Sequence, residues 1–239
     1  MATSENPSLK ILHTNDLHGV LSAAKYERLK VLRGSADLYF DTGDAIKAGN
    51  LGIPVRQEPV WGLLDSLGCD AGVLGNRETH VWAGPFEAKL AGAKHPILCA
   101  NLRRKDGTRP LPGTLVLERR GIRIGLVGVM VPMVTERMKT QAASVYLWDP
   151  PIPVAQALGA ELRPTVDLLF ALTHIGHRED RKLAEKGIFD VIFGGHSHTV
   201  LPEPELVGAT WICQGGSHAR YGGVYTWDAG LSGGLIPLS

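Results

Sequence analysis

The sequence predicts an α/β fold, in which strands and helices alternate along the chain. Short apolar runs of strand length recur between segments of helical character, and glycine-containing polar motifs follow several of these runs. In α/β proteins the loops at the carboxyl ends of the strands commonly gather the ligand-binding groups. We therefore expect the polar motifs to lie close together at one edge of the sheet structure.

The first half of the chain supplies six of the expected strands and two of the expected helices. Apolar, β-rich runs predict strands at residues 9–13, 37–41, 71–74, 96–100, 114–118 and 122–129. Helices are expected at residues 58–67 and 85–93. Segments 49–54 and 106–113 are rich in glycine and proline and predict surface loops. The first of these loops closely follows Asp44, so it is a candidate edge of an active-site mouth.

The second half of the chain continues the alternation. Helices are expected at residues 152–162 and 178–186, and strands at residues 166–172, 189–193, 209–214 and 222–228. No internal repeat, low-complexity segment or long linker interrupts these elements. Because 239 residues can form one large α/β domain, we expect a single domain over residues 1–239.

The composition is that of an ordinary soluble globular protein, with 44% hydrophobic and 6% aromatic residues. The net charge of +1 gives no bulk electrostatic case for a nucleic-acid polymer or an anionic membrane. No stretch approaches the roughly 20 apolar residues of a membrane span, and the polar N-terminus does not resemble a signal peptide. Three widely spaced cysteines, Cys69, Cys99 and Cys213, are expected to be buried free thiols. We therefore expect a cytoplasmic protein, of an oligomeric state that the sequence does not indicate.

Five polar motifs, each after a β-rich run, contain the residue types that bind metal ions. The strongest is Gly194-Gly195-His196-Ser197-His198, and the others lie at residues 16–18, 41–44, 75–78 and 173–174. Imidazole and carboxylate ligands suit Zn, Mn or Fe, and no cysteine is among the candidate ligands to favour a thiolate site. A pair of ions about 3.5–4 Å apart can hold a hydroxide and clamp phosphoryl oxygens during in-line displacement. The motifs therefore indicate hydrolysis of phosphate esters.

These motifs together resemble those of the metallophosphoesterases. The resemblance is carried by the segment from His13 to Gly19, by Gly43-Asp44 and Gly75-Asn76, by the segment 173–176 and by the Gly-Gly-His-Ser-His motif. More narrowly, residues 9–228 resemble the N-terminal catalytic domain of the 5′-nucleotidase and 2′,3′-cyclic nucleotide phosphodiesterase family. The resemblance implies a four-layer α/β/β/α sandwich with two central mixed sheets. We expect no counterpart of the C-terminal nucleotide-specificity domain that the secreted nucleotidases carry.

The resemblance also implies a ligand set for two divalent metal ions, with Mn, Zn or Fe as candidates. Asp41 is expected to orient its loop or a ligand, and His13 is expected to belong to a strand. The implied ligands are Asp16, His18 and His198 for one ion, Asn76, His174 and His196 for the other, and Asp44 between the two ions.

The sequence departs from the family pattern after Asn76. The family usually has a histidine at the next position and an aspartate three residues later, whereas this chain has Arg77 and His80. If a helix begins after Asn76, residues 77 and 80 share one of its faces. Arginine cannot serve as a general acid, so we expect Arg77 to bind non-bridging phosphate oxygens and His80 or water to handle the leaving-group proton. The alternative is that Arg77 forms an ion pair with Glu78 or another carboxylate in a weak enzyme.

The sequence therefore favours a two-metal phosphoesterase, whose catalytic groups would include Asn76, Arg77 and His80. We expect in-line attack by a metal-bridging hydroxide on a small phosphomonoester or phosphodiester, with nucleotides and cyclic nucleotides among the candidates. The alternative is a sensor or interaction protein that binds metal and phosphate with little turnover. The changed residue at position 77 is the observation that motivates this alternative.

Overall fold

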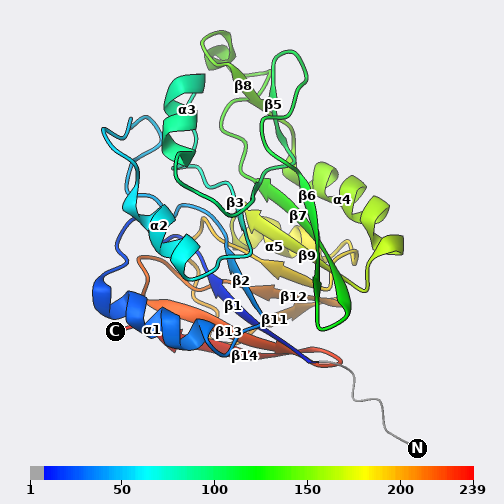
Figure 1. Cartoon of the computed structure of the whole chain (residues 1–239). Coiled ribbons are helices and arrows are strands. Elements are labelled where there is room, and N and C mark those ends of the chain that lie inside the picture. The colour runs from blue at the N-terminus through cyan, green and yellow to red at the C-terminus, as the bar shows by residue number, and fades with distance from the viewer. Residues whose placement is uncertain (1–7) are drawn as a thin grey trace, which may run out of the picture.

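Two six-stranded mixed sheets form the centre of the protein in a computed structural model that describes residues 8–239 (Figure 1). In each sheet four neighbouring strands are parallel, and antiparallel strands complete the sheet. The first sheet has the order β14 (Leu231–Pro237), β13 (Tyr221–Trp227), β1 (Leu9–Thr14), β2 (Leu38–Asp41), β3 (Ala71–Val73) and β4 (Ile97–Leu98). The second has the order β11 (Glu205–Val207), β12 (Thr210–Cys213), β10 (Val191–Phe193), β9 (Leu168–His174), β7 (Ile122–Met130) and β6 (Thr114–Arg119).

The alternation of side chains along the strands creates three apolar cores. In β2, Phe40 points between the sheets, where its ring centroid lies 5.6 Å from that of Phe193 in the second sheet. Its neighbour Tyr39 points to the opposite face and packs in a different core. In β7, Leu126 likewise faces the first sheet, whereas Val127 belongs to the core on the outer face. Both sheets are therefore buried on two sides.

Helices cover the outer faces of both sheets. Helices α1 (Ala23–Arg33) and α2 (Pro59–Ser66) contribute to the core outside the first sheet, and α4 (Pro151–Leu162) and α5 (His177–Ala184) to the core outside the second. Helix α3 (Ala83–Leu90) packs against a small sheet of β5 (Leu102–Arg104) and β8 (Tyr146–Trp148), with 4.8 Å between the Phe86 and Tyr146 rings. The predicted α/β/β/α sandwich with two mixed sheets is confirmed.

Each strand and helix expected from the sequence is present, with ends shifted by a few residues. The sequence missed α1, β5, β8, β11 and β14. Helix α1 is amphipathic only weakly, because Leu29 is its single fully buried residue, and strand β14 contains adjacent glycines that disfavour a strand prediction. Two short 3-10 turns, η1 (Lys139–Ala142) and η2 (Arg163–Thr165), complete the structure. None of the helices within residues 8–239 has the length and apolarity that crossing a bilayer requires.

Candidate metal centre

The ends of parallel strands from both sheets carry the predicted ligands to one place. Three loops come from the first sheet, after β1, β2 and β3, and one comes from the second sheet, after β10. His174 is the last residue of β9 itself, which extends two residues beyond the predicted strand. The structure brings together all seven predicted ligands, which are Asp16, His18, Asp44, Asn76, His174, His196 and His198.

The backbone of these loops adopts conformations that L-residues rarely take. Five of the seven predicted ligands have positive φ angles, and such strained residues persist only where the surrounding structure holds them. Hydrogen bonds between the first two loops supply part of this support, because the amides of Asp16 and His18 donate to the carbonyls of Gly43 and Asp44, both at 2.9 Å. The five φ angles are 51° at Asp16, 53° at His18, 52° at Asp44, 77° at His196 and 56° at His198.

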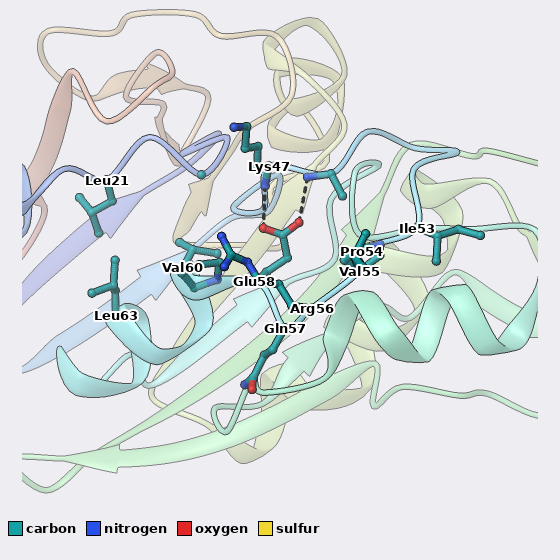
Figure 2. Close-up of a pocket in the computed structure, with 13 residues that line it drawn as sticks. Leu21, Lys47, Ile53, Pro54, Val55, Arg56, Gln57, Glu58, Val60 and Leu63 are labelled. Carbon is teal, nitrogen blue, oxygen red and sulfur yellow. Dashed lines mark hydrogen bonds between the residues drawn. The ribbon is translucent and has the colours of Figure 1, made fainter.

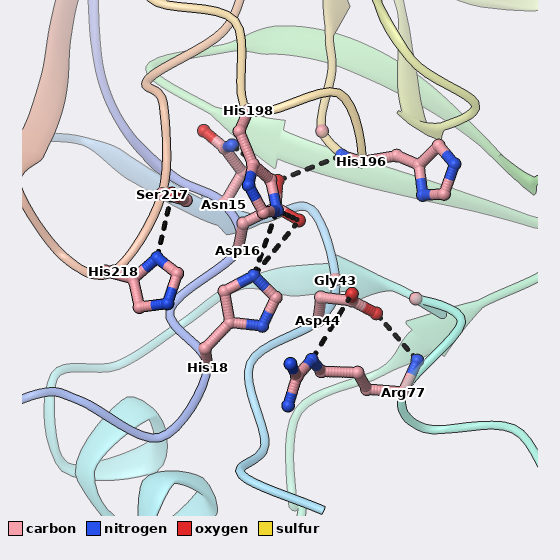
Figure 3. Close-up of polar contacts among 12 residues, drawn as sticks. Asn15, Asp16, His18, Gly43, Asp44, Arg77, His196, His198, Ser217 and His218 are labelled. Atoms are coloured by element: carbon pink, nitrogen blue, oxygen red, sulfur yellow. Dashed lines mark hydrogen bonds and ion pairs between the residues drawn. The ribbon is translucent and has the colours of Figure 1, made fainter. Parts of the chain in front are cut away.

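The first group of ligands surrounds a buried carboxylate oxygen (Figure 3). Asp16 Oδ2 accepts hydrogen bonds from the Asn15 side chain at 2.7 Å and the His196 amide at 2.9 Å. Asp16 Oδ1 is buried and has no hydrogen-bond partner, yet it lies 3.3 Å from His198 Nε2 and 3.8 Å from His18 Nε2. The two imidazole Nε2 atoms are themselves 3.0 Å apart. A buried, unpartnered oxygen that faces two imidazole nitrogens fits a cation between them.

The second group centres on the Asn76 side-chain oxygen. Asn76 Oδ1 lies 3.1 Å from His174 Nε2 and 2.8 Å from His196 Nδ1. His174 Nδ1 lies 2.7 Å from the carbonyl of Thr42, which can only accept, so Nδ1 carries the proton and Nε2 presents its lone pair. His174 Nε2 is also 3.4 Å from Asp44 Oδ1. Asp44 therefore lies against the second group.

Asp44 also lies close to the first group. Ligand atoms of Asp16, Asp44 and His174 all lie within 4.8 Å of one another. Burial, together with the positive charge of Arg77, lowers the pKa of His18 to about 4. Burial also lowers the pKa of His196. Both imidazoles are therefore neutral near pH 7, which is the form that binds metal. The donor set fits two divalent cations.

Arg77 reaches the centre, where it pairs with a carboxylate as one of the two sequence-based alternatives expects. Its amide donates to Asp44 Oδ1 at 2.7 Å, and its guanidinium Nε lies 3.8 Å from Asp44 Oδ2 (Figure 3). Its guanidinium Nη1 donates to the carbonyl of Lys47 at 2.9 Å. The carboxylate partner of Arg77 is therefore Asp44 rather than Glu78.

The prediction that residues 77 and 80 share a helix face is wrong. Residues 76–79 form one turn, and α3 begins only at Ala83. The ammonium group of Lys89 explains the break, because it binds the carbonyls of Arg77 and Thr79, both at 2.7 Å, which a helix would need for its own hydrogen bonds. His80 instead accepts a hydrogen bond from the Trp82 amide at 3.0 Å, and its ring centroid lies 5.5 Å from that of Trp82.

Two buried ionisable residues organise the loops after β2 and β3, a role that the sequence does not predict for either of them. Glu78 Oε2 accepts from the amides of Asp44 and Gly75, both at 3.0 Å, and Glu78 Oε1 accepts from Ile46 at 3.2 Å. Lys89 is fully buried and donates to four backbone carbonyls. No local pattern marks Lys89, because its partners lie 10–40 residues away.

Three further residues border the ligands. His218 was not assigned to the site from the sequence, but its ring centroid lies 4.7 Å from that of His18 and its amide donates to the Asp16 carbonyl at 2.7 Å. Asp41 accepts hydrogen bonds from the Thr14 hydroxyl and the Gly43 amide, and burial raises its pKa to about 8. His13 lies within β1. The predictions that Asp41 orients its loop and that His13 belongs to a strand are confirmed.

A two-sheet sandwich with a centre of carboxylates and imidazoles at its strand ends defines the class of metallophosphoesterases. The family model described as calcineurin-like phosphoesterase matches residues 9–200, which is most of the chain. The chain therefore belongs to the calcineurin-like phosphoesterase family. The prediction of a phosphoester hydrolase that uses divalent metal is confirmed at the level of this family.

The chain is also similar to individual proteins of known name. A 5′-nucleotidase from Vibrio vulnificus is 29% identical over 224 residues, which are 79% of this chain and 40% of the relative. The 5′-nucleotidase precursor from Thermus thermophilus has a TM-score of 0.75 at 24% identity, over 96% of this chain and 53% of that one. A sulfate thiohydrolase from the same species has a TM-score of 0.80 at 18% identity, over 96% and 56%. The two solved structures show a shared fold, and this chain spans only 40–56% of the three proteins.

Proposed function

We propose that the protein hydrolyses a small phosphomonoester or phosphodiester with the help of two divalent ions. The observation that supports this most strongly is the position of Asp44, whose carboxylate oxygen lies within 4.8 Å of ligand atoms of both Asp16 and His174. Asp16, His18 and His198 would hold one ion, and Asn76, His174 and His196 the other, with Asp44 shared. When bound, Mn, Zn or Fe would activate water and neutralise charge on the phosphoryl group.

The chain's own residues would hold the substrate and keep the ligands in the right state. Arg77, whose Nε lies 3.8 Å from Asp44 Oδ2, would bind non-bridging phosphate oxygens through its planar guanidinium. Thr42 fixes the tautomer of His174, so that its Nε2 stays available. We assign the leaving-group proton to water rather than to His80, whose ring packs against Trp82.

Nucleotides are the first substrates to test, because relatives of this chain are named 5′-nucleotidases. The fold does not settle the substrate, since a sulfate thiohydrolase shares it. The cytoplasmic location stays a prediction. Comparison of 5′-AMP, 2′,3′-cyclic AMP and bis-p-nitrophenyl phosphate would rank monoester against diester hydrolysis.

The central experiment measures hydrolysis of mono- and bis-p-nitrophenyl phosphate by metal-free protein resupplied with Mn, Zn, Fe or Mg. We expect turnover only with metal, and a loss of at least about 100-fold in Asp44→Asn. The exposed Asp228→Asn is the matched control and should keep the wild-type rate. Tight metal binding without turnover of either ester would favour the alternative of a sensor protein, which the Arg77–Asp44 ion pair motivates.

A further inference from the structure

A cavity lies next to the metal centre. Its volume is about 440 Å³, which is within the range of small-molecule sites. It lies between the start of α2, the segment after His18 and the loop after Asp44 (Figure 2). This loop includes the glycine- and proline-rich segment that the sequence places at the edge of an active-site mouth.

The walls of the cavity are apolar, and part of this apolar surface is open to solvent. Leu21, Val60 and Leu63 lie on one side, and Ile53 and Val55 lie on the opposite side (Figure 2). Ile53 is 55% exposed and Val55 is fully exposed. Aliphatic side chains gathered at the border of a cavity are typical of a surface that an apolar ligand covers.

The charged side chains that line the cavity without an ionic partner are positive. Lys47 and Arg56 are exposed and form no ion pair within residues 8–239. The single acidic residue of the lining, Glu58, is buried and already accepts from the backbone amides of Lys47 at 3.2 Å and Ala48 at 3.0 Å. The cavity therefore presents two unpaired cations beside apolar walls, which suits an anionic amphipathic molecule.

The cavity and the metal centre share backbone segments. Gly19 lines the cavity and directly follows the ligand His18, and a Cβ at Gly19 would lie 2.7 Å from Lys47 Cβ. The Gly19 amide also donates to the Ala45 carbonyl at 2.7 Å, beside Asp44. Arg77 then joins the two sites, because it contacts Asp44 and donates to the carbonyl of Lys47. A substrate whose phosphate lies at Arg77 can therefore extend past Lys47 into the cavity.

We infer that this cavity binds the leaving group of the substrate, and that the substrate is a phosphate ester of an apolar group that carries a second anionic group. The inference rests on the proposed function for the position of the reacting phosphate. The aliphatic walls contact the apolar part of the leaving group. Lys47 and Arg56 bind its second anion, which a simple alkyl or phenyl ester lacks.

The kinetic test compares phenyl phosphate with 4-carboxyphenyl phosphate on the Mn-loaded enzyme. We expect Lys47→Gln and Arg56→Gln each to raise KM for the carboxylated ester about tenfold, while KM for phenyl phosphate stays unchanged. The matched control is Arg178→Gln on the outer helix α5, which should change neither value. Equal effects of the cavity variants on both esters, or no effect on either, would overturn the inference.

A binding test separates this inference from the proposed function. The fluorescent probe 1-anilinonaphthalene-8-sulfonate, which is apolar and anionic, is titrated into metal-free protein and its variants. We expect binding to wild type and to Arg178→Gln, and at least about tenfold weaker binding to the double variant Lys47→Gln/Arg56→Gln. This result without any ester turnover would retain the cavity and reject the phosphoesterase, whereas equal probe binding by all variants would reject the cavity.

Discussion

The two sheets support their metal-binding loops with different kinds of side chain. On the first-sheet side, the loops after β2 and β3 are held by the buried carboxylates of Glu58 and Glu78 and by the ammonium group of Lys89. Lys89 alone donates to the carbonyls of four residues, namely Gly49 at 2.7 Å, Asn50 at 2.9 Å, Arg77 at 2.7 Å and Thr79 at 2.7 Å.

On the second-sheet side, amide and hydroxyl side chains hold the loop that carries His196 and His198, together with the Asp16 carboxylate that accepts from the His196 amide. The Gln214 side chain donates to the Gly195 carbonyl at 3.1 Å and accepts from Ser197 at 2.7 Å and from the Thr199 amide at 2.8 Å. The Thr42 hydroxyl donates to the Gly194 carbonyl at 2.9 Å. An ionised side chain can hold several backbone groups strongly, but its loss leaves all of them unpaired in a buried place. The first-sheet side should therefore be the more sensitive to substitution.

The largest effect is expected from Lys89→Met, which keeps the length of the side chain but removes its donors. Each buried carbonyl left without a partner costs roughly 1–3 kcal/mol, so we expect a loss of at least about 3 kcal/mol in the free energy of unfolding. Urea denaturation of the metal-free protein measures this loss. The exposed Lys30→Met is the control and should stay within about 0.5 kcal/mol of wild type. A similarly small loss in Lys89→Met would contradict the expectation that the first-sheet side is the more sensitive to substitution.

A smaller effect, on the metal-activated rate, is expected when each side loses one side chain that binds the backbone of the ligand loops. Glu78→Gln replaces an acceptor oxygen by a donor, so at least one of the amides of Asp44, Gly75 and Ile46 loses its partner. Residues that orient metal ligands typically contribute 10–100-fold to metal affinity or activity. We expect a loss near 100-fold in the metal-activated rate for Glu78→Gln and near tenfold for the neutral Gln214→Met. The reverse order would show that the loop after β10 is the more dependent one.

The sequence predicts where the candidate ligands lie, because each of them follows a recognisable predicted strand. Asp16 and His18 lie directly after β1, and His196 and His198 after β10, so local patterns place them at strand ends. The supporting groups are different. Lys89 reads as an ordinary helix lysine, and only the packing of α3 against distant loops reveals that it is buried. The same lysine binds the carbonyls of Arg77 and Thr79, where a helix would be needed to place Arg77 and His80 on one face, so their positions could not be predicted.

Asp180 sharpens the comparison, because it is an acidic group on the otherwise neutral side. It lies beneath the ligand loop, where a Cβ at Gly194 would collide with its carboxylate, and it accepts from the Thr173 hydroxyl at 2.6 Å. Burial raises its pKa to about 7 from 3.8, so the carboxyl group is largely protonated below pH 7 in the folded protein. The Asp180 carboxyl group therefore stays neutral in mildly acidic solution.

The pH dependence of stability tests this protonation. Between pH 3.8 and about 7 the folded chain keeps a proton on Asp180 that the unfolded chain has released. The stabilisation of the folded state by this proton is fully present at low pH and is lost as the pH rises through 7. Asp180→Asn cannot titrate. We expect its free energy of unfolding, relative to wild type, to increase by about 1 kcal/mol for each pH unit from pH 5 to 7, as measured by urea denaturation of metal-free protein. The exposed Asp228→Asn is the control and should show no such trend. If the free energies of unfolding of Asp180→Asn and wild type change in parallel with pH, then Asp180 is ionised and both sides of the site rest on buried charge.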